Sequence, residues 1–87
     1  MNEFLIKSYI SRLTLNDIDS FARSNGILFT NDELRLVNDY VKRDWHTIIY
    51  GNPRPILDNL KNSLDDFKYN KIENLYIEFK NKYSNYL

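Results

Sequence analysis

No cysteine occurs among the 87 residues of the chain, and glycine, proline, histidine and tryptophan are rare. Without cysteine the chain has no disulfide framework, no thiolate nucleophile and no Cys-based metal site, which suits a reducing cytoplasm. Two glycines are too few for a glycine-rich phosphate loop. His46, the single histidine, leaves a zinc site or a Ser–His–acid triad short of members. We therefore expect a protein that is not an enzyme and that holds no metal or cofactor.

The sequence also lacks an excess of positive or negative charge, and it lacks long hydrophobic runs. Twelve basic residues balance twelve acidic ones, which disfavours a binder of phosphate backbones. No apolar run approaches the roughly 18 residues of a membrane span, and Glu3 stands where a signal peptide carries basic residues. At 10.5 kDa the chain is long enough for one domain, residues 1–87. The sequence predicts a soluble cytoplasmic domain without a membrane partner or a small-molecule ligand.

Apolar residues recur at helical spacing along most of the chain. Because the connections between these stretches are short, they predict an all-α fold, a compact bundle of four to five short helices. The expected helices cover residues 3–12, residues 15–24, a longer stretch between Thr30 and Gly51, residues 55–64 and residues 70–85.

Three local signals set the expected ends of the second and third helices. Thr14 with Asp17, and Thr30 with Glu33, have the spacing of capping boxes, in which side chain and backbone at a helix start satisfy one another. Gly26 supplies the left-handed residue that commonly ends a helix. These signals predict where the second helix begins and ends and where the third helix begins.

The ends of the fourth and fifth helices are less sharply marked. Asn52 and Arg54 each precede a proline, which disfavours the helical region, so both are expected to be extended. Pro55 then fits the first turn of the fourth helix. Asn70 with Glu73 forms a possible capping box for the last helix.

The segment 45–55 is the strongest candidate contact site, because it carries the only tryptophan, the only histidine and both prolines. A stiff loop that presents arginine and aromatic side chains loses little entropy when a partner docks. Trp45, His46, Tyr50 and Arg54 are therefore candidate residues for binding a protein partner. A competing interpretation is that Trp45, Ile48 and Ile49 close the core and the prolines only set the path of the chain into the fourth helix.

Aromatic residues also form a seam along the last helix. This face is expected to pack on the bundle with tyrosine hydroxyls at the rim, or to serve as a partner or self-association surface. The seam consists of Tyr69, Tyr76 and Tyr83 at one heptad position and Ile72, Phe79 and Tyr86 at the next.

The same helix raises an alternative function, weak binding of RNA or single-stranded nucleic acid. Residues 68–87 hold four lysines against two glutamates among several tyrosines, and stacking aromatics with basic flanks suit single strands. Lys71, Tyr76, Lys80 and Tyr83 are the candidate residues. The modest excess of positive charge makes nucleic acid the less favoured partner.

The order of these features resembles the YqfT-like family of small bacterial proteins. The matching stretches are the first short helix, residues 14–27, residues 30–33 opening a longer helix, and residues 72–79. The resemblance implies a helical cytoplasmic protein and carries no catalytic or binding residue across. Taken together, the sequence predicts a non-enzymatic protein-interaction or structural accessory module, with an unknown protein or a second copy as partner.

Overall fold

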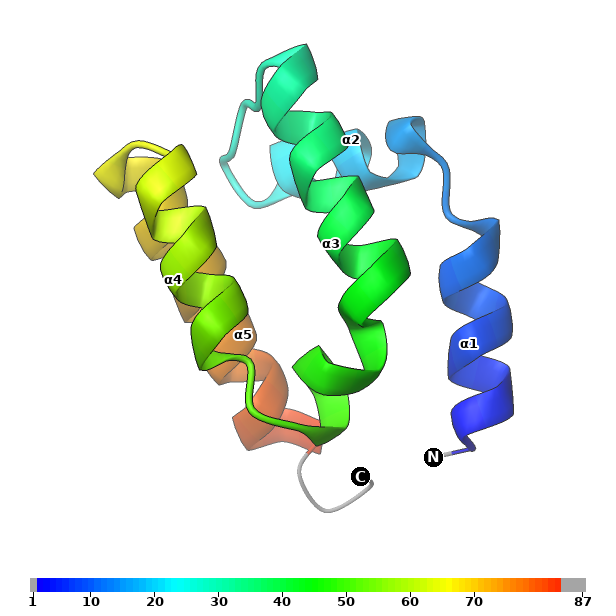
Figure 1. The fold of residues 1–87 in the computed structure, drawn as a ribbon. Coiled ribbons are helices and arrows are strands. Elements are labelled where there is room, and N and C mark those ends of the chain that lie inside the picture. The colour runs from blue at the N-terminus through cyan, green and yellow to red at the C-terminus, as the bar shows by residue number, and fades with distance from the viewer. Residues whose placement is uncertain (1, 84–87) are drawn as a thin grey trace.

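The computed structural model describes residues 2–83, which form five α-helices and no strand (Figure 1). The predicted all-α bundle of short helices is confirmed. The predicted end of the last helix at residue 85, and Tyr86 of the aromatic seam, lie outside the described residues. The helices are α1 (Glu3–Arg12), α2 (Leu15–Ser24), α3 (Asn31–Tyr50), α4 (Arg54–Ser63) and α5 (Asp66–Tyr83).

Both capping boxes form as the sequence predicts. At the start of α2, Thr14 N donates to Asp17 Oδ2 at 2.9 Å and Asp17 N donates to Thr14 Oγ1 at 3.1 Å. At the start of α3, the same pair of bonds joins Thr30 and Glu33 at 2.9 and 3.2 Å. Gly26 has a φ of 79°, the left-handed conformation expected after α2. The local rules therefore place these boundaries correctly.

Arg54 is the first residue of α4, so its predicted extended conformation is wrong. The side chain of Asn52 accepts a hydrogen bond from Arg54 N at 3.1 Å, and this turn starts the helix one residue before Pro55. Pro55 lies in the first turn of α4, where a backbone N–H has no intrahelical partner, so the helix tolerates it there although proline disfavours the helical conformation of Arg54.

The last helix begins at Asp66, four residues before the predicted start, so the capping box predicted at Asn70 is wrong. Asp65 is the residue that starts the helix, because its Oδ1 accepts a hydrogen bond from Lys68 N at 2.8 Å. Asn70 lies inside α5, and Glu73 accepts instead from the hydroxyl of Tyr69 at 2.6 Å.

The two halves of the bundle meet at α3. In Figure 1, α1 lies on one side of α3, the antiparallel pair α4 and α5 lies on the other, and α2 crosses behind α3. Among the described helices, α1 packs against α3 alone. No helix of the described residues is both long and apolar enough to cross a membrane.

Helix α3 changes direction near its end. Asp44 has φ −116° and ψ 15°, outside the helical region, although neither proline nor glycine lies there. Arg43 Nε donates to the Asp44 carboxylate at 3.1 Å beside the kink. Residues 45–50 therefore run at an angle to the first part of α3, as Figure 1 shows.

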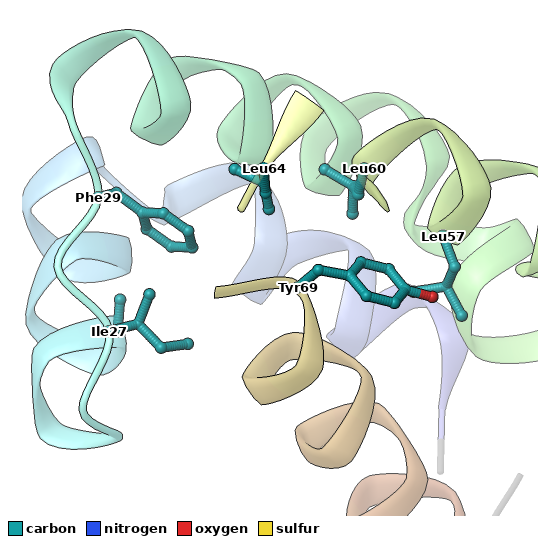
Figure 2. Packing of buried hydrophobic residues seen from close by; sticks show 7 residues of the cluster. Ile27, Phe29, Leu57, Leu60, Leu64 and Tyr69 are labelled. Carbon is teal, nitrogen blue, oxygen red and sulfur yellow. The ribbon is translucent and has the colours of Figure 1, made fainter. Parts of the chain in front are cut away.

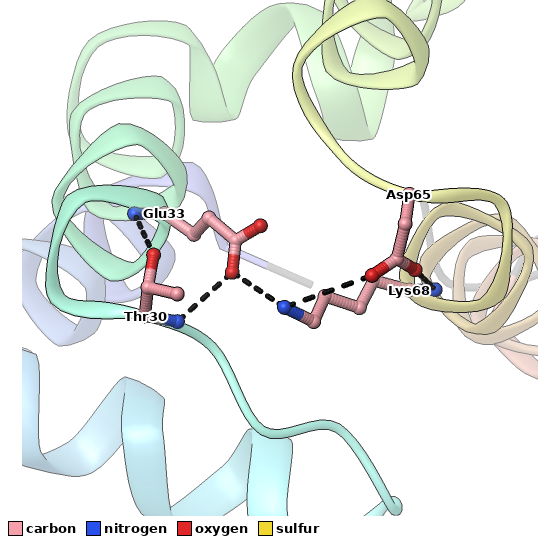
Figure 3. Close-up of polar contacts among 4 residues, drawn as sticks. All are labelled: Thr30, Glu33, Asp65 and Lys68. Atoms are coloured by element: carbon pink, nitrogen blue, oxygen red, sulfur yellow. Dashed lines mark hydrogen bonds and ion pairs between the residues drawn. The ribbon is translucent and has the colours of Figure 1, made fainter.

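Two lysines of α5 join both ends of that helix to α3. Near the start, Lys68 Nζ lies 2.7 Å from Glu33 Oε1 and 3.8 Å from Asp65 Oδ2 (Figure 3). Near the other end, Lys80 Nζ donates to the carbonyl oxygen of Ile49 at 3.3 Å. The α4–α5 pair is thus held to α3 at two separate points.

The most deeply buried side chains gather where the α2–α3 connection meets the α4–α5 pair (Figure 2). Ile27 is the most buried at 2% exposure, and no described side chain falls below that value. The core is therefore closed at this end of the bundle, while apolar side chains farther along α3, such as Val41, Trp45 and Ile48, are only partly buried. The buried cluster consists of Ala22, Ile27, Phe29, Leu57, Leu60, Leu64 and Tyr69.

Candidate functional site

An apolar cleft of about 880 Å³ lies between the two halves of the bundle and draws lining residues from all five helices. Of the described residues that line it, all but Arg12, Asp17 and Ser20 are aliphatic, aromatic or proline. This volume and lining match the pockets in which proteins bind ligands or apolar parts of partners.

The walls of the cleft are the apolar stripes that the sequence pattern assigns to each helix. Val41, Trp45 and Ile48 form part of the α3 wall, and Leu75 and Phe79 form part of the α5 wall. All five are only partly buried, so these stripes face one another without closing the space between them. The kink at Asp44 lies within the α3 wall.

The mouth of the cleft runs along α1 and α2. The lining residues that are exposed, Tyr9, Arg12, Asp17, Ser20 and Phe21, all belong to these two helices. Tyr9 is 62% exposed and Phe21 is 61% exposed. Two large aromatic side chains, Tyr9 and Phe21, therefore flank the opening. Among the described residues that line the cleft, the charged ones, Arg12 and Asp17, also lie at this rim.

Two charged side chains next to the connection between α1 and α2, Lys42 and Asp17, are held by local bonds. Lys42 Nζ donates to the carbonyl oxygens of Ile10 and Leu13 at 2.6 and 2.5 Å. The backbone N–H of Thr14, followed by its hydroxyl, lowers the pKa of Asp17, which stays ionised at neutral pH. The interior thus offers carbon surface and the rim offers one charge of each sign.

Three of the residues predicted to bind a protein partner come together on α3. The rings of Trp45 and His46 are 5.4 Å apart edge to face, and those of His46 and Tyr50 are 5.0 Å apart. Only Trp45 lines the cleft. His46 instead lies toward α1, with Nε2 3.4 Å from Glu3 Oε2.

Arg54, the fourth predicted residue, is engaged within the protein. Its Nη1 lies 3.5 Å from Tyr69 Oη, 3.7 Å from Glu73 Oε2 and 3.8 Å from Asp58 Oδ1. The hydrogen bond from Tyr69, and then Arg54, lower the pKa of Glu73, and the same carboxylate raises the pKa of Tyr69. Arg54 therefore joins α4 to α5 and does not line the cleft.

The candidate nucleic-acid residues are spread along α5. Lys71 lies over the Phe67 ring at 5.5 Å, while Lys80 donates to a carbonyl of α3. Nine residues, about two and a half helical turns, separate these lysines, so they leave α5 on opposite sides. Tyr76 lines the cleft, and Tyr83 contacts the Phe79 ring at 5.3 Å. Binding of single strands by this helix stays a prediction.

Tyr9 and Phe21 were not among the residues that the sequence analysis selected. Helical periodicity places both on the apolar stripes of α1 and α2, and a sequence pattern alone predicts such stripes to be core. A signal was present in α1, where Phe4, Leu5 and Tyr9 extend the apolar arc well beyond Ile6. An apolar arc this wide on a single helix indicates a second contact.

In comparisons with known proteins, no family model, no curated protein and no solved structure matches the chain. The resemblance to the YqfT-like family therefore stays a prediction from the sequence. Within the described residues, no group of three or more His, Cys, Asp or Glu side chains is placed to hold a metal ion.

Proposed function

We propose that the protein is a non-enzymatic interaction module of a bacterial cytoplasm, and that it receives an apolar helical face of a protein partner in the cleft. The observation that carries this proposal is the cleft itself, about 880 Å³ in volume with only three lining residues that are neither apolar nor aromatic. Contiguous apolar surface that stays open to solvent marks protein-interaction sites in proteins of this size.

The chemistry of the lining favours a helix over an extended segment. A helix satisfies its own backbone N–H and C=O groups, whereas an isolated strand must find partners for them. The interior of the cleft supplies carbon surface, and each unpaired peptide group buried there would cost about 1–3 kcal/mol. An amphipathic helix with apolar residues three and four positions apart suits such a groove.

Trp45 supports the same proposal from inside the cleft. Tryptophan is the side chain most enriched among residues that carry binding energy, and here it lies on the α3 wall with part of its surface open. Of the four residues predicted to bind a protein partner, the proposed contact includes Trp45. The contact lies in the cleft and not on the loop that the sequence predicted.

A comparison of two phenylalanine variants tests the proposal. Phe21 lies at the mouth and is 61% exposed, and Phe67 is 62% exposed on α5 outside the cleft. The tagged wild-type chain and Phe67→Ser should capture the same partner from the native cell, and Phe21→Ser should lose it. Equal capture by both variants, or no specific partner for the wild type, would contradict the proposed function.

A further inference from the structure

Helix α1 presents apolar side chains on two sides. Ile6 is 9% exposed against α3, whereas Phe4 is 74%, Leu5 63% and Tyr9 62% exposed. A helix at a protein surface normally keeps one apolar stripe and a polar opposite face. Because α1 packs only on α3 among the described helices, its second apolar side has no cover from the part of the chain that the structure describes.

The exposed apolar side chains of α1, taken together with Phe21 of α2, are large enough to matter for association. At about 150–250 Å² per large side chain, the exposed fractions of Phe4, Leu5, Tyr9 and Phe21 amount to on the order of 500 Å². The largest apolar patch of a typical monomer is about 300–600 Å², and a stable interface covers about 800 Å² on each partner. The four side chains with the adjoining cleft approach that requirement.

The mouth carries one positive and one negative side chain, so the mouths of two copies are complementary in charge. Arg12 on α1 and Asp17 on α2 both line the rim and are both exposed. In an interface with two-fold symmetry, a contact between residues of the two copies occurs twice with the roles exchanged. Arg12 of one copy can therefore meet Asp17 of the other at both ends of the interface. The zero net charge adds no long-range repulsion between copies.

We propose that the partner is a second copy of this chain: the two α1 helices pack side by side about a two-fold axis, and each covers the mouth of the other copy's cleft. Tyr9 and Phe21 lie at the centre of this interface, with Arg12 and Asp17 at its edge. The inference rests on the proposed function, because it names the helix that enters the cleft as α1 of the other chain.

A membrane surface suits the same side chains less well. Interfacial helices combine an apolar face with a strongly basic polar face, whereas α1 carries one acid and two bases, and the chain as a whole is neutral. Binding to a bilayer would also leave the cleft without a helix to fill it. The membrane is therefore an outcome that the test must distinguish.

Sedimentation equilibrium of the full chain, with two pairs of matched variants, tests the dimer. The wild type should sediment at twice the 10.5 kDa chain mass. Tyr9→Ser should raise the dimer dissociation constant at least about tenfold, because the residue acts twice in a symmetric interface. Phe67→Ser removes an equally exposed aromatic side chain outside the cleft and should leave the dissociation constant unchanged.

Charge reversal gives a second, independent comparison on α1. Arg12→Glu would face Asp17 of the other copy and should also weaken the dimer, whereas Lys7→Glu reverses a charge about 140° around the same helix from Arg12, away from Tyr9, and should not. Circular dichroism of each variant confirms that the helices remain. The two charge-reversal variants still test the dimer if Tyr9→Ser disturbs the fold.

Three results would overturn the dimer. They are a wild type that stays monomeric up to millimolar concentration, equal dissociation constants for all four variants, and a monomer that cosediments with anionic vesicles through α1. A monomer whose Phe21→Ser variant still loses a captured partner would remove the second copy as occupant and leave the proposed function standing. If the wild type stays monomeric and Phe21→Ser does not lose a captured partner, both proposals fail.

Discussion

Lys42 Nζ lies 2.6 Å from the carbonyl oxygen of Ile10 and so joins the middle of α3 to the end of α1. Ile10 O also accepts a hydrogen bond from Leu13 N at 3.1 Å, and a cation at this end of the helix is favourable for the helix dipole. Because α1 has no other helix to pack on among the described residues, this contact holds the wall that carries Tyr9 at the mouth.

Replacing Lys42 by methionine should loosen α1 without removing the apolar stem of the side chain. The expected loss is about 1–2 kcal/mol in the free energy of unfolding, since two bonds from a charged donor disappear. Denaturant titration measures the free energy, and amide hydrogen exchange should show faster opening of α1 than of α5. Unchanged exchange in α1 would show that apolar packing alone holds the helix.

Gly26→Ala should destabilise the fold by about 1–2 kcal/mol, because a side chain disfavours the left-handed conformation. The φ of Gly26 is 79°, and an added Cβ would meet Lys71 Nζ at 3.5 Å, an ordinary contact. The cost is therefore conformational and not steric. Gly26→Asn is the control, since asparagine tolerates this conformation, and thermal unfolding should place it between the wild type and Gly26→Ala. Equal melting temperatures would refute the conformational argument.

The ion pair of Glu33 and Lys68 should make the free energy of unfolding depend on pH in the acidic range. The two atoms lie 2.7 Å apart with both side chains less than one-fifth exposed, and the bond from Lys68 is the largest cause that lowers the pKa of Glu33. A carboxyl group with a lowered pKa contributes stability above its ordinary value of 4.5, and this contribution is lost as the pH falls through the folded pKa.

Glu33→Gln should therefore flatten the decline of the free energy of unfolding below about pH 4.5 relative to the wild type. Denaturant titrations at several pH values between 7 and 3 measure the decline. Glu78→Gln, which replaces an exposed carboxylate of α5, is the matched control and should keep the wild-type slope. A Glu33→Gln slope equal to that of the wild type would contradict the assignment.

Trp45 should report whether the cleft is covered, because it is the only tryptophan and it lines the α3 wall. Its emission should shift to shorter wavelength, and acrylamide should quench it less, as the chain concentration rises through the dimer dissociation constant. Tyr9→Ser should delay both changes to higher concentration. Emission that stays constant while the mass doubles would place the dimer interface away from the cleft.

Local rules predicted the parts of the fold that depend on a few adjacent residues. Thr14 and Thr30 start helices and Gly26 ends one, as their side-chain chemistry requires. The start of α5 was misplaced because Asp65 and Asn70 both have the chemistry of a cap, and the choice between them depends on tertiary contacts such as Lys68 with Glu33.

The cleft depends on geometry that no local rule contains. Periodicity shows which side chains are apolar, whereas the space between two apolar stripes depends on how the helices cross. In α3 that crossing includes a kink at Asp44, where neither proline nor glycine marks it. Trp45 was selected for its residue type and does line the cleft, while Arg54 was selected on the same grounds and is held by Glu73 and Tyr69.

The absence of cysteine allows the most direct test of the central claim, that a protein surface covers the cleft. Ser20→Cys places one thiol at the mouth, and Ser63→Cys places one on the exposed end of α4 outside it. Alkylation rates are compared between the dilute chain and the chain in complex, with a second copy or with a captured partner. The account predicts slower alkylation of Ser20→Cys alone in the complex; equal rates for Ser20→Cys in the free and complexed states would contradict it.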